Sequence, residues 1–351
     1  MHSRVAHKAR EYVGSGPPGS RSKTAMRSSR LGRIISLALL IATAAALPHA
    51  SAQDFPVRPI RLIQGFAAGG NADTVARILG QEMAKGLGQS VLVEPKPGAG
   101  STIAADAVAK APPDGYTLLL VTGGHPVAGA LYKALPFNTV DSFEMVSTAT
   151  FFPFLVIVRA DFPAQSIRSL LDMARAKPGS VAFGSAGTGA TQHLTGELLG
   201  SMAGVQFLHV PYKGDSAAIT GLLGGDTQFV IAPATAALGQ IRAGRLRAIA
   251  ATGPVRWQGL PDVPSVAESG VADFDVRSWM GLATTAGTPQ AIVDRLNAEM
   301  QRVLRVPEVR AKLEEIGGEV RGSTPGEMRA RVATELKNWT QVIQQARIER
   351  Q

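Results

Sequence analysis

Two glycine-rich loops have the composition in this sequence best suited to binding a small anion. The first runs from Phe66 to Asp73 and reads FAAGGNAD, and the second runs from Gly184 to Gln192 and reads GSAGTGATQ. Each follows a short apolar run typical of a buried strand and precedes apolar residues at helical spacing. Glycine lets a backbone approach a ligand closely, and a helix N-terminus presents unpaired N–H groups and the positive end of the helix dipole. The two junctions therefore predict an anion site; a plain strand-to-helix turn is the alternative for each loop.

The predicted ligand-binding residues come from these two loops and from a third strand-end loop around His125. They are Phe66, Ala68, Gly69, Gly70, Asn71, Asp73, His125, Ser185, Ala186, Thr188, Gly189, Thr191 and Gln192. Ligands of open α/β sheets sit beyond the carboxyl ends of the strands. Two loops that face each other there could hold one carboxylate between two helix N-termini. Backbone N–H groups would make the contacts, and the hydroxyls of the second loop would add to them.

Motifs for other chemistries are missing from the sequence. The chain has no cysteine, which excludes disulfides and thiolate catalysis. Neither the dinucleotide pattern nor the P-loop nor the hydrolase GxSxG pattern is complete, and the six histidines show no metal-binding spacing. We therefore expect no metal and no cofactor. We expect hydrogen-bonded structural roles for His125, His193 and His209, although an enzyme that uses Ser185 or His193 remains an alternative.

The positive charge of the chain is concentrated in its N-terminal segment. The formal net charge is +9, but residues 1–52 hold 8 of the 36 basic and 1 of the 27 acidic residues, which leaves 28 − 26 = +2 for the rest. This distribution argues against a nucleic-acid partner. An arginine-containing stretch, an apolar run at 34–47 and the triplet Ala50-Ser51-Ala52 have the order of a signal peptide. We predict cleavage before Gln53, export to the periplasm and a translation start at Met26.

Strand and helix signals alternate along the rest of the chain. Apolar runs at 60–63, 116–121, 154–158 and 279–284 predict strands, with amphipathic helices between them and a helical C-terminal tail from Thr324. Alternation of this kind predicts an α/β fold with mainly parallel sheets flanked by helices.

Several short phrases carry a resemblance to one protein family. They are RPIRLI at 58–63, FAAGG at 66–70, GAG at 98–100, PDGYTLL at 113–119, VPYKG at 210–214, LPDVP at 260–264 and AGTP at 286–289. With these phrases the chain, from about Phe55 to Trp339, resembles the Bug-family receptors, the substrate-binding subunits of tripartite tricarboxylate transporters. The resemblance implies a monomeric, non-catalytic "Venus flytrap" of the type II periplasmic-binding-protein class, with a carboxylate held in the cleft between two lobes. It also implies membrane permease subunits as partners.

The fold implied by the resemblance predicts where the lobes begin and end. A chain that crosses twice between lobes makes one of them discontinuous. We place the crossings near 154–159 and 271–278. Lobe 1 then comprises 53–155 with 275–351, and lobe 2 comprises 156–274.

Departures from the family pattern affect the expected ligand. Gln228 stands where relatives commonly have an acid, Ala232-Pro233 ends a strand where many have a polar residue, and Asn71-Ala72 replaces a hydroxyl. No candidate wall residue is an arginine or lysine, so a tricarboxylate would bury carboxylates without cationic partners. We expect a monocarboxylate or a slim diacid to be preferred over citrate. Two further functions also fit the sequence: a sensory receptor of the same fold, and an interaction protein that binds no ligand.

Overall fold

The computed structural model describes residues 55–346 and 348–351. The predicted leader and its cleavage site before Gln53 lie outside the described residues. None of the helices in the described part of the chain combines the length and apolar character that a membrane crossing requires.

The described strands join into one ten-stranded sheet. Its main order is β2-β1-β3-β9-β4-β7-β5-β6, and β8 and β10 each pair with β4. Parallel pairing joins β1 to β2 and β3, and also β5 to β6 and β7. The strands are β1 (Ile60–Gln64), β2 (Val91–Pro95), β3 (Thr117–Thr122), β4 (Phe143–Arg159), β5 (Ala182–Ser185), β6 (Leu208–Pro211), β7 (Phe229–Pro233), β8 (Leu246–Ala251), β9 (Arg277–Thr285) and β10 (Glu319–Val320). The predicted α/β class is confirmed, with parallel strands on either side of two antiparallel ones.

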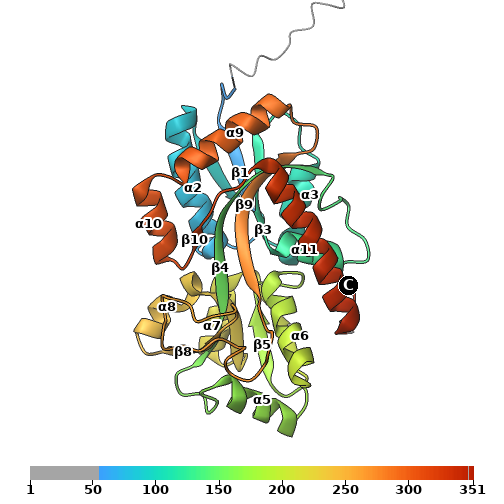
Figure 1. Cartoon of the computed structure of the whole chain (residues 1–351), viewed down its shortest axis with the longest axis vertical. Coiled ribbons are helices and arrows are strands. Elements are labelled where there is room, and N and C mark those ends of the chain that lie inside the picture. The colour runs from blue at the N-terminus through green and yellow to red at the C-terminus, as the bar shows by residue number, and fades with distance from the viewer. Residues whose placement is uncertain (1–54, 347) are drawn as a thin grey trace, which may run out of the picture. The chain divides into compact units, whose positions relative to one another are not determined.

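The long strand β4 links the two parallel groups. From Phe143 to Pro153 it pairs antiparallel with β9, and from Phe154 to Arg159 it pairs with β7 and β8 instead. Figure 1 shows β4 and β9 running together through the middle of the sheet. We call β1, β2, β3, β9, β10 and the first part of β4 the first sheet half, and β5 to β8 with the rest of β4 the second sheet half. The sequence predicted only the end of β4, and its beginning at Phe143 was missed.

Helices cover both faces of the first sheet half. Leu62 and Leu118 pack in a core with residues of α2 and α9, whereas the adjacent Ile63 and Leu119 pack in another with residues of α3 and α11. Burial on both faces explains why these strands read as continuous apolar runs. The helices are α2 (Asn71–Leu87), α3 (Thr102–Ala109), α4 (Gly124–Leu131), α5 (Ile167–Ala176), α6 (Thr191–Ala203), α7 (Asp215–Gly224), α8 (Ala234–Arg242), α9 (Gln290–Val303), α10 (Pro307–Glu315) and α11 (Pro325–Gln345), with a 3-10 turn, η2, at Ala99–Ser101.

The predicted C-terminal helix is α11. Thr324 and Glu327 form a capping box at its start, in which each side chain accepts the backbone N–H of the other residue. Met328, Val332 and Ile343 are buried along its inner face. The helical tail predicted from Thr324 is therefore confirmed.

Candidate functional site

The first glycine-rich loop connects β1 to α2. Its start is fixed by Gln64, whose side-chain Oε1 accepts the N–H of Phe66 at 2.8 Å. Its middle is fixed by Asp73, whose Oδ2 accepts the N–H of Gly69 at 3.1 Å and also pairs with Arg77 at 2.9 Å. Gly70 is the N-cap of α2 and has no side chain to bond the first turn. The loop therefore leaves the N–H groups at the start of α2 available.

The second glycine-rich loop connects β5 to α6. Ser185 Oγ accepts the N–H of Gly187 at 3.1 Å, and Nδ1 of His193 accepts the N–H of Gly189 at 3.4 Å. Both glycines have positive φ, +132° and +80°, which side-chain-bearing residues rarely adopt. Ala190 is the N-cap of α6 and gives no side-chain cap. The N–H groups of Gly187 and of Gly189, the latter a predicted ligand-binding residue, are thus used inside the loop.

Both loops end at one small cavity of about 20 Å³. Four helices begin at this cavity: α2, α6, α7 and α8, none of which has a side-chain N-cap. The lining residues are Phe66, Asn71, Ala72, Thr122, Phe152, Phe154, Thr191, Gln192, Asp215, Pro233, Ser278 and Met280. The predicted meeting of strand-end loops is therefore present in the structure.

Unpaired backbone donors belong to residues of two helices that line this cavity. In the described part of the chain no acceptor receives the N–H groups of Asn71 and Ala72 at the start of α2. The same holds for Thr191 and Gln192 at the start of α6. Such groups, with the positive ends of two helix dipoles, favour a negatively charged ligand atom. The cavity can thus offer donors from both sheet halves to one carboxylate.

The predicted residues divide between the cavity and its surroundings. The lining includes Phe66, Asn71, Thr191 and Gln192, and Gly70 borders it, since a Cβ there would lie 4.0 Å from Asp215 Oδ2. The remaining loop residues do not line the cavity. They are Ala68, Gly69, Asp73, Ser185, Ala186, Thr188 and Gly189.

His125 belongs to an aromatic cluster and does not line the cavity. Its Nε2 lies 2.8 Å from the carbonyl oxygen of Thr139, and its ring stacks on Phe137 and meets the edge of Phe143. Burial lowers the pKa of His125 to about 4, so the ring is neutral at pH 7. These contacts agree with the structural role expected from the sequence.

Several contacts across the cavity join the two sheet halves. The N–H of Ala67 donates to the Lys213 carbonyl oxygen at 3.0 Å, and the Thr235 hydroxyl donates to Asn71 Oδ1 at 2.6 Å. Gly100 lies so close to the second loop that a Cβ on it would be 2.5 Å from the Thr188 carbonyl oxygen. A cavity of about 20 Å³ has room for roughly one water molecule. An organic acid is larger than one water molecule, so the side chains that line the cavity would have to move apart to admit it.

Asp215 is a cavity residue that the sequence interpretation missed. It is the first residue of α7, its side chain accepts a hydrogen bond from Gln192 Nε2 at 2.8 Å, and it is 7% exposed. Burial raises the pKa of Asp215 to about 7. An available signal was its position immediately after the VPYKG phrase at 210–214, at another strand-to-helix junction.

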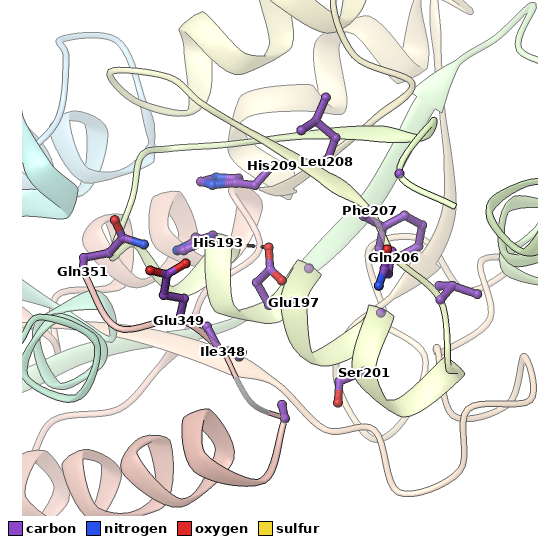
Figure 2. A pocket seen from close by; sticks show the side chains of 15 residues that line it. His193, Glu197, Ser201, Gln206, Phe207, Leu208, His209, Ile348, Glu349 and Gln351 are labelled. Atoms are coloured by element: carbon purple, nitrogen blue, oxygen red, sulfur yellow. Dashed lines mark ion pairs between the residues drawn. The ribbon is translucent and has the colours of Figure 1, made fainter. Parts of the chain in front are cut away.

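A second and larger cavity, of about 520 Å³, lies between α6, β6 and the C-terminal tail. Figure 2 shows its side chains, including His193 and His209, whose rings stack with centroids 3.9 Å apart. His193 Nε2 is 3.8 Å from Glu197, and His209 Nε2 is 2.7 Å from Ser185 Oγ. Burial lowers the pKa of His209 to about 3, which makes the ring a weak base, and Ser185 is fully buried. The Ser185–His209 pair is therefore poorly suited to nucleophilic catalysis.

No group of three or more potential metal ligands occurs among the residues that the structure describes.

A family model for the tripartite tricarboxylate transporter family receptor matches residues 75–348. The chain belongs to this family. The family consists of periplasmic solute receptors, not of enzymes. The seven short phrases between residues 58 and 289 had indicated this family from the sequence, and the identification is confirmed.

Solved structures similar to this receptor support the same assignment. The periplasmic binding protein BugD is 36% identical with a TM-score of 0.81, over 85% of this chain and all of its own. R. palustris Rpa4515 with adipate is 33% identical with a TM-score of 0.80, covering 84% of this chain and 98% of its own. MatC (Rpa3494) from Rhodopseudomonas palustris with bound malate is 33% identical with a TM-score of 0.79, covering 82% of this chain and all of its own. The predicted periplasmic-binding-protein fold is confirmed.

Proposed function

We propose that this receptor captures a small organic carboxylate in the cavity at the starts of α2 and α6. The observation that carries the proposal is the set of free N–H groups on Asn71, Ala72, Thr191 and Gln192, which line one cavity from two sheet halves. A charge-assisted hydrogen bond contributes about 1.5–3 kcal/mol net. Two or three such bonds contribute about 3–9 kcal/mol, whereas a micromolar affinity is about 8.2 kcal/mol after the cost of association, so apolar contact with the cavity wall must supply the remainder.

Closure around the ligand would give the loaded receptor a conformation that a partner can distinguish from the open, empty receptor. The contacts of Ala67 with Lys213 and of Thr235 with Asn71 join the two sheet halves in this structure, and a separation of the halves would break them. A membrane permease that binds the closed form would receive loaded receptor in preference to empty receptor. We infer that the partners are the permease subunits of a tripartite tricarboxylate transporter and that the receptor works as a monomer.

The cavity wall bears on which acids fit. None of the described lining residues is a lysine or arginine, and Phe66, Phe152, Phe154 and Met280 contribute apolar surface. Solved relatives are described with adipate and with malate, which are diacids. We infer that the ligand is a monocarboxylate or a slim diacid, in preference to citrate.

A ligand screen tests the proposed function. Thermal shift with a panel of mono- and dicarboxylates, followed by titration calorimetry, should find at least one acid that binds with micromolar or tighter affinity. Gly70→Val should abolish that binding with a cooperative melt retained. The atoms nearest to a Cβ at Gly70 are the Ala67 carbonyl oxygen at 3.7 Å, Ser216 Oγ at 3.8 Å and Asp215 Oδ2 at 4.0 Å, so the branched side chain of valine would occupy the space between them. Undiminished binding by this variant would contradict the assignment of the cavity.

The export route and the lobe limits are part of the same proposal. We infer that the leader is removed before Gln53 in the periplasm, and N-terminal sequencing of periplasmic protein tests this. A mature protein that begins elsewhere would contradict it. We retain lobe limits of 53–155 with 275–351 and of 156–274, which a rigid-body comparison of open and closed crystal forms would test.

A further inference from the structure

The site contains one ionisable side chain of its own, and it is an acid. Asp215 lines the cavity and is 7% exposed, and the other described lining residues are neutral. Its Oδ1 accepts a hydrogen bond from Gln192 at 2.8 Å. Its Oδ2 has no hydrogen-bond donor among the described residues and lies 4.0 Å from the position that a Cβ on Gly70 would take. One oxygen of a buried carboxylate is therefore available beside the free N–H groups of α2.

No cationic side chain pairs with Asp215. The ion pairs of the described residues do not include it, and Lys213, two residues earlier, is exposed. A buried carboxylate without a cationic partner is unfavourable in its charged form, and burial accordingly raises the pKa of Asp215 to about 7. A second carboxylate brought into the same cavity would increase this penalty through like-charge repulsion. A ligand with a positive group would relieve it.

The cavity thus combines donors for an anion with an acceptor for a cation. The helix starts at Asn71 and Thr191 supply the donors, and Asp215 supplies the acceptor, with Gln192 contributing to both. We propose that Asp215 makes this receptor select carboxylates that also carry an ammonium group, namely α-amino acids, a selectivity that rests on the proposed function. The carboxylate would bind the free N–H groups, and the ammonium group would bind Asp215 Oδ2.

Matched ligand pairs test this selectivity. Each α-amino acid of a panel is titrated beside the same acid without its amino group, with norvaline against pentanoate and 2-aminoadipate against adipate as fixed members. In the parent protein we expect the best amino acid to bind at least tenfold more tightly than its counterpart. Asp215→Asn should weaken the binding of that amino acid at least tenfold, and the plain acid should bind the variant as tightly as the parent or more tightly. Asp226 is an exposed acid just beyond the end of α7, and Asp226→Asn is the matched control. It should change neither the affinity for the amino acid nor the affinity for the plain acid.

The outcomes separate this inference from the proposed function. If plain acids bind and their amino counterparts bind no more tightly, the receptor remains a carboxylate receptor and the role of Asp215 is refuted. If amino acids are preferred but Asp215→Asn leaves the preference unchanged, the ammonium site lies elsewhere and the inference is also refuted. If neither class binds, both the inference and the proposed function fail. A melting curve of each variant establishes that it is folded.

Discussion

Gly100 is the position where one methyl group should block closure of the cavity. A Cβ on Gly100 would lie 2.5 Å from the Thr188 carbonyl oxygen, 2.7 Å from Gly189 C and 2.8 Å from the Ala190 nitrogen, all of them backbone atoms. Ordinary contact begins at 3.4 Å, so the second loop would have to retreat by about 3.4 − 2.5 = 0.9 Å. That loop leads into the start of α6, where two of the proposed donors lie. Gly100→Ala should therefore misplace one side of the anion site.

The expected effect is a loss of affinity that backbone strain alone does not produce. Gly100 has φ 60° and ψ 31°, and Gly204 at the end of α6 has φ 65° and ψ 37°, with no atom within 4 Å of the position that a Cβ on Gly204 would take. Gly204→Ala therefore carries the same left-handed strain, about 1–3 kcal/mol, without the clash. We expect Gly100→Ala to weaken carboxylate binding at least tenfold, which is about 1.4 kcal/mol, and Gly204→Ala to stay within about twofold of the parent.

Titration calorimetry with the carboxylate that binds most tightly in the screen measures the affinities. Thermal melts measure the loss of stability caused by the backbone strain that both variants share. Small-angle scattering with and without ligand then reports whether Gly100→Ala still closes. Equal affinities for Gly100→Ala and Gly204→Ala would refute the view that binding requires the close approach of η2 to the second loop.

Three further predictions concern pH, packing and ligand charge. The pKa of Asp215 is about 7 in the folded protein against an ordinary 3.8. Ionisation of this carboxyl therefore destabilises the folded protein increasingly between about pH 4 and 7. Asp215→Asn should hence raise the melting temperature at pH 8 and change it little at pH 4; an equal shift at both would contradict this. Leu79→Ala, at a fully buried position, should cost about 2–5 kcal/mol, whereas Leu92→Ala, 51% exposed, should stay within about 0.5 kcal/mol by denaturant unfolding; similar costs would contradict the packing. Calorimetry should rank citrate below a C4 to C6 diacid and an aromatic monoacid; citrate binding tightest would refute the inferred role of the cavity wall.

The local part of the site could be predicted from the sequence because it is encoded locally. The two loops combine glycines, an apolar strand before them and an uncapped helix after them, and all of these are neighbours in the chain. Asn71 and Thr191 were identified in this way. The internal use of the Gly187 and Gly189 N–H groups could not be predicted, because it depends on the orientations of Ser185 and His193.

The rest of the site depends on packing between distant segments. Asp215 faces Gly70 only because the start of α7 packs beside the start of α2 across the two sheet halves. Its neighbours in the chain include the exposed Lys213, so the local sequence carries no sign of burial. The first part of β4 was missed for a similar reason. Polar residues such as Ser147 and Thr148 interrupt its apolar pattern. Both are buried, and their side chains form hydrogen bonds with the backbone of the distant Ser323 and Arg321.

A crystal structure of the receptor with its tightest carboxylate tests the central claim most directly. We expect one carboxylate oxygen within hydrogen-bonding distance of the N–H groups at Asn71 or Ala72 and the other near those at Thr191 or Gln192. A ligand bound in the cavity beside His193 and the C-terminal tail, with the starts of α2 and α6 unoccupied, would contradict it.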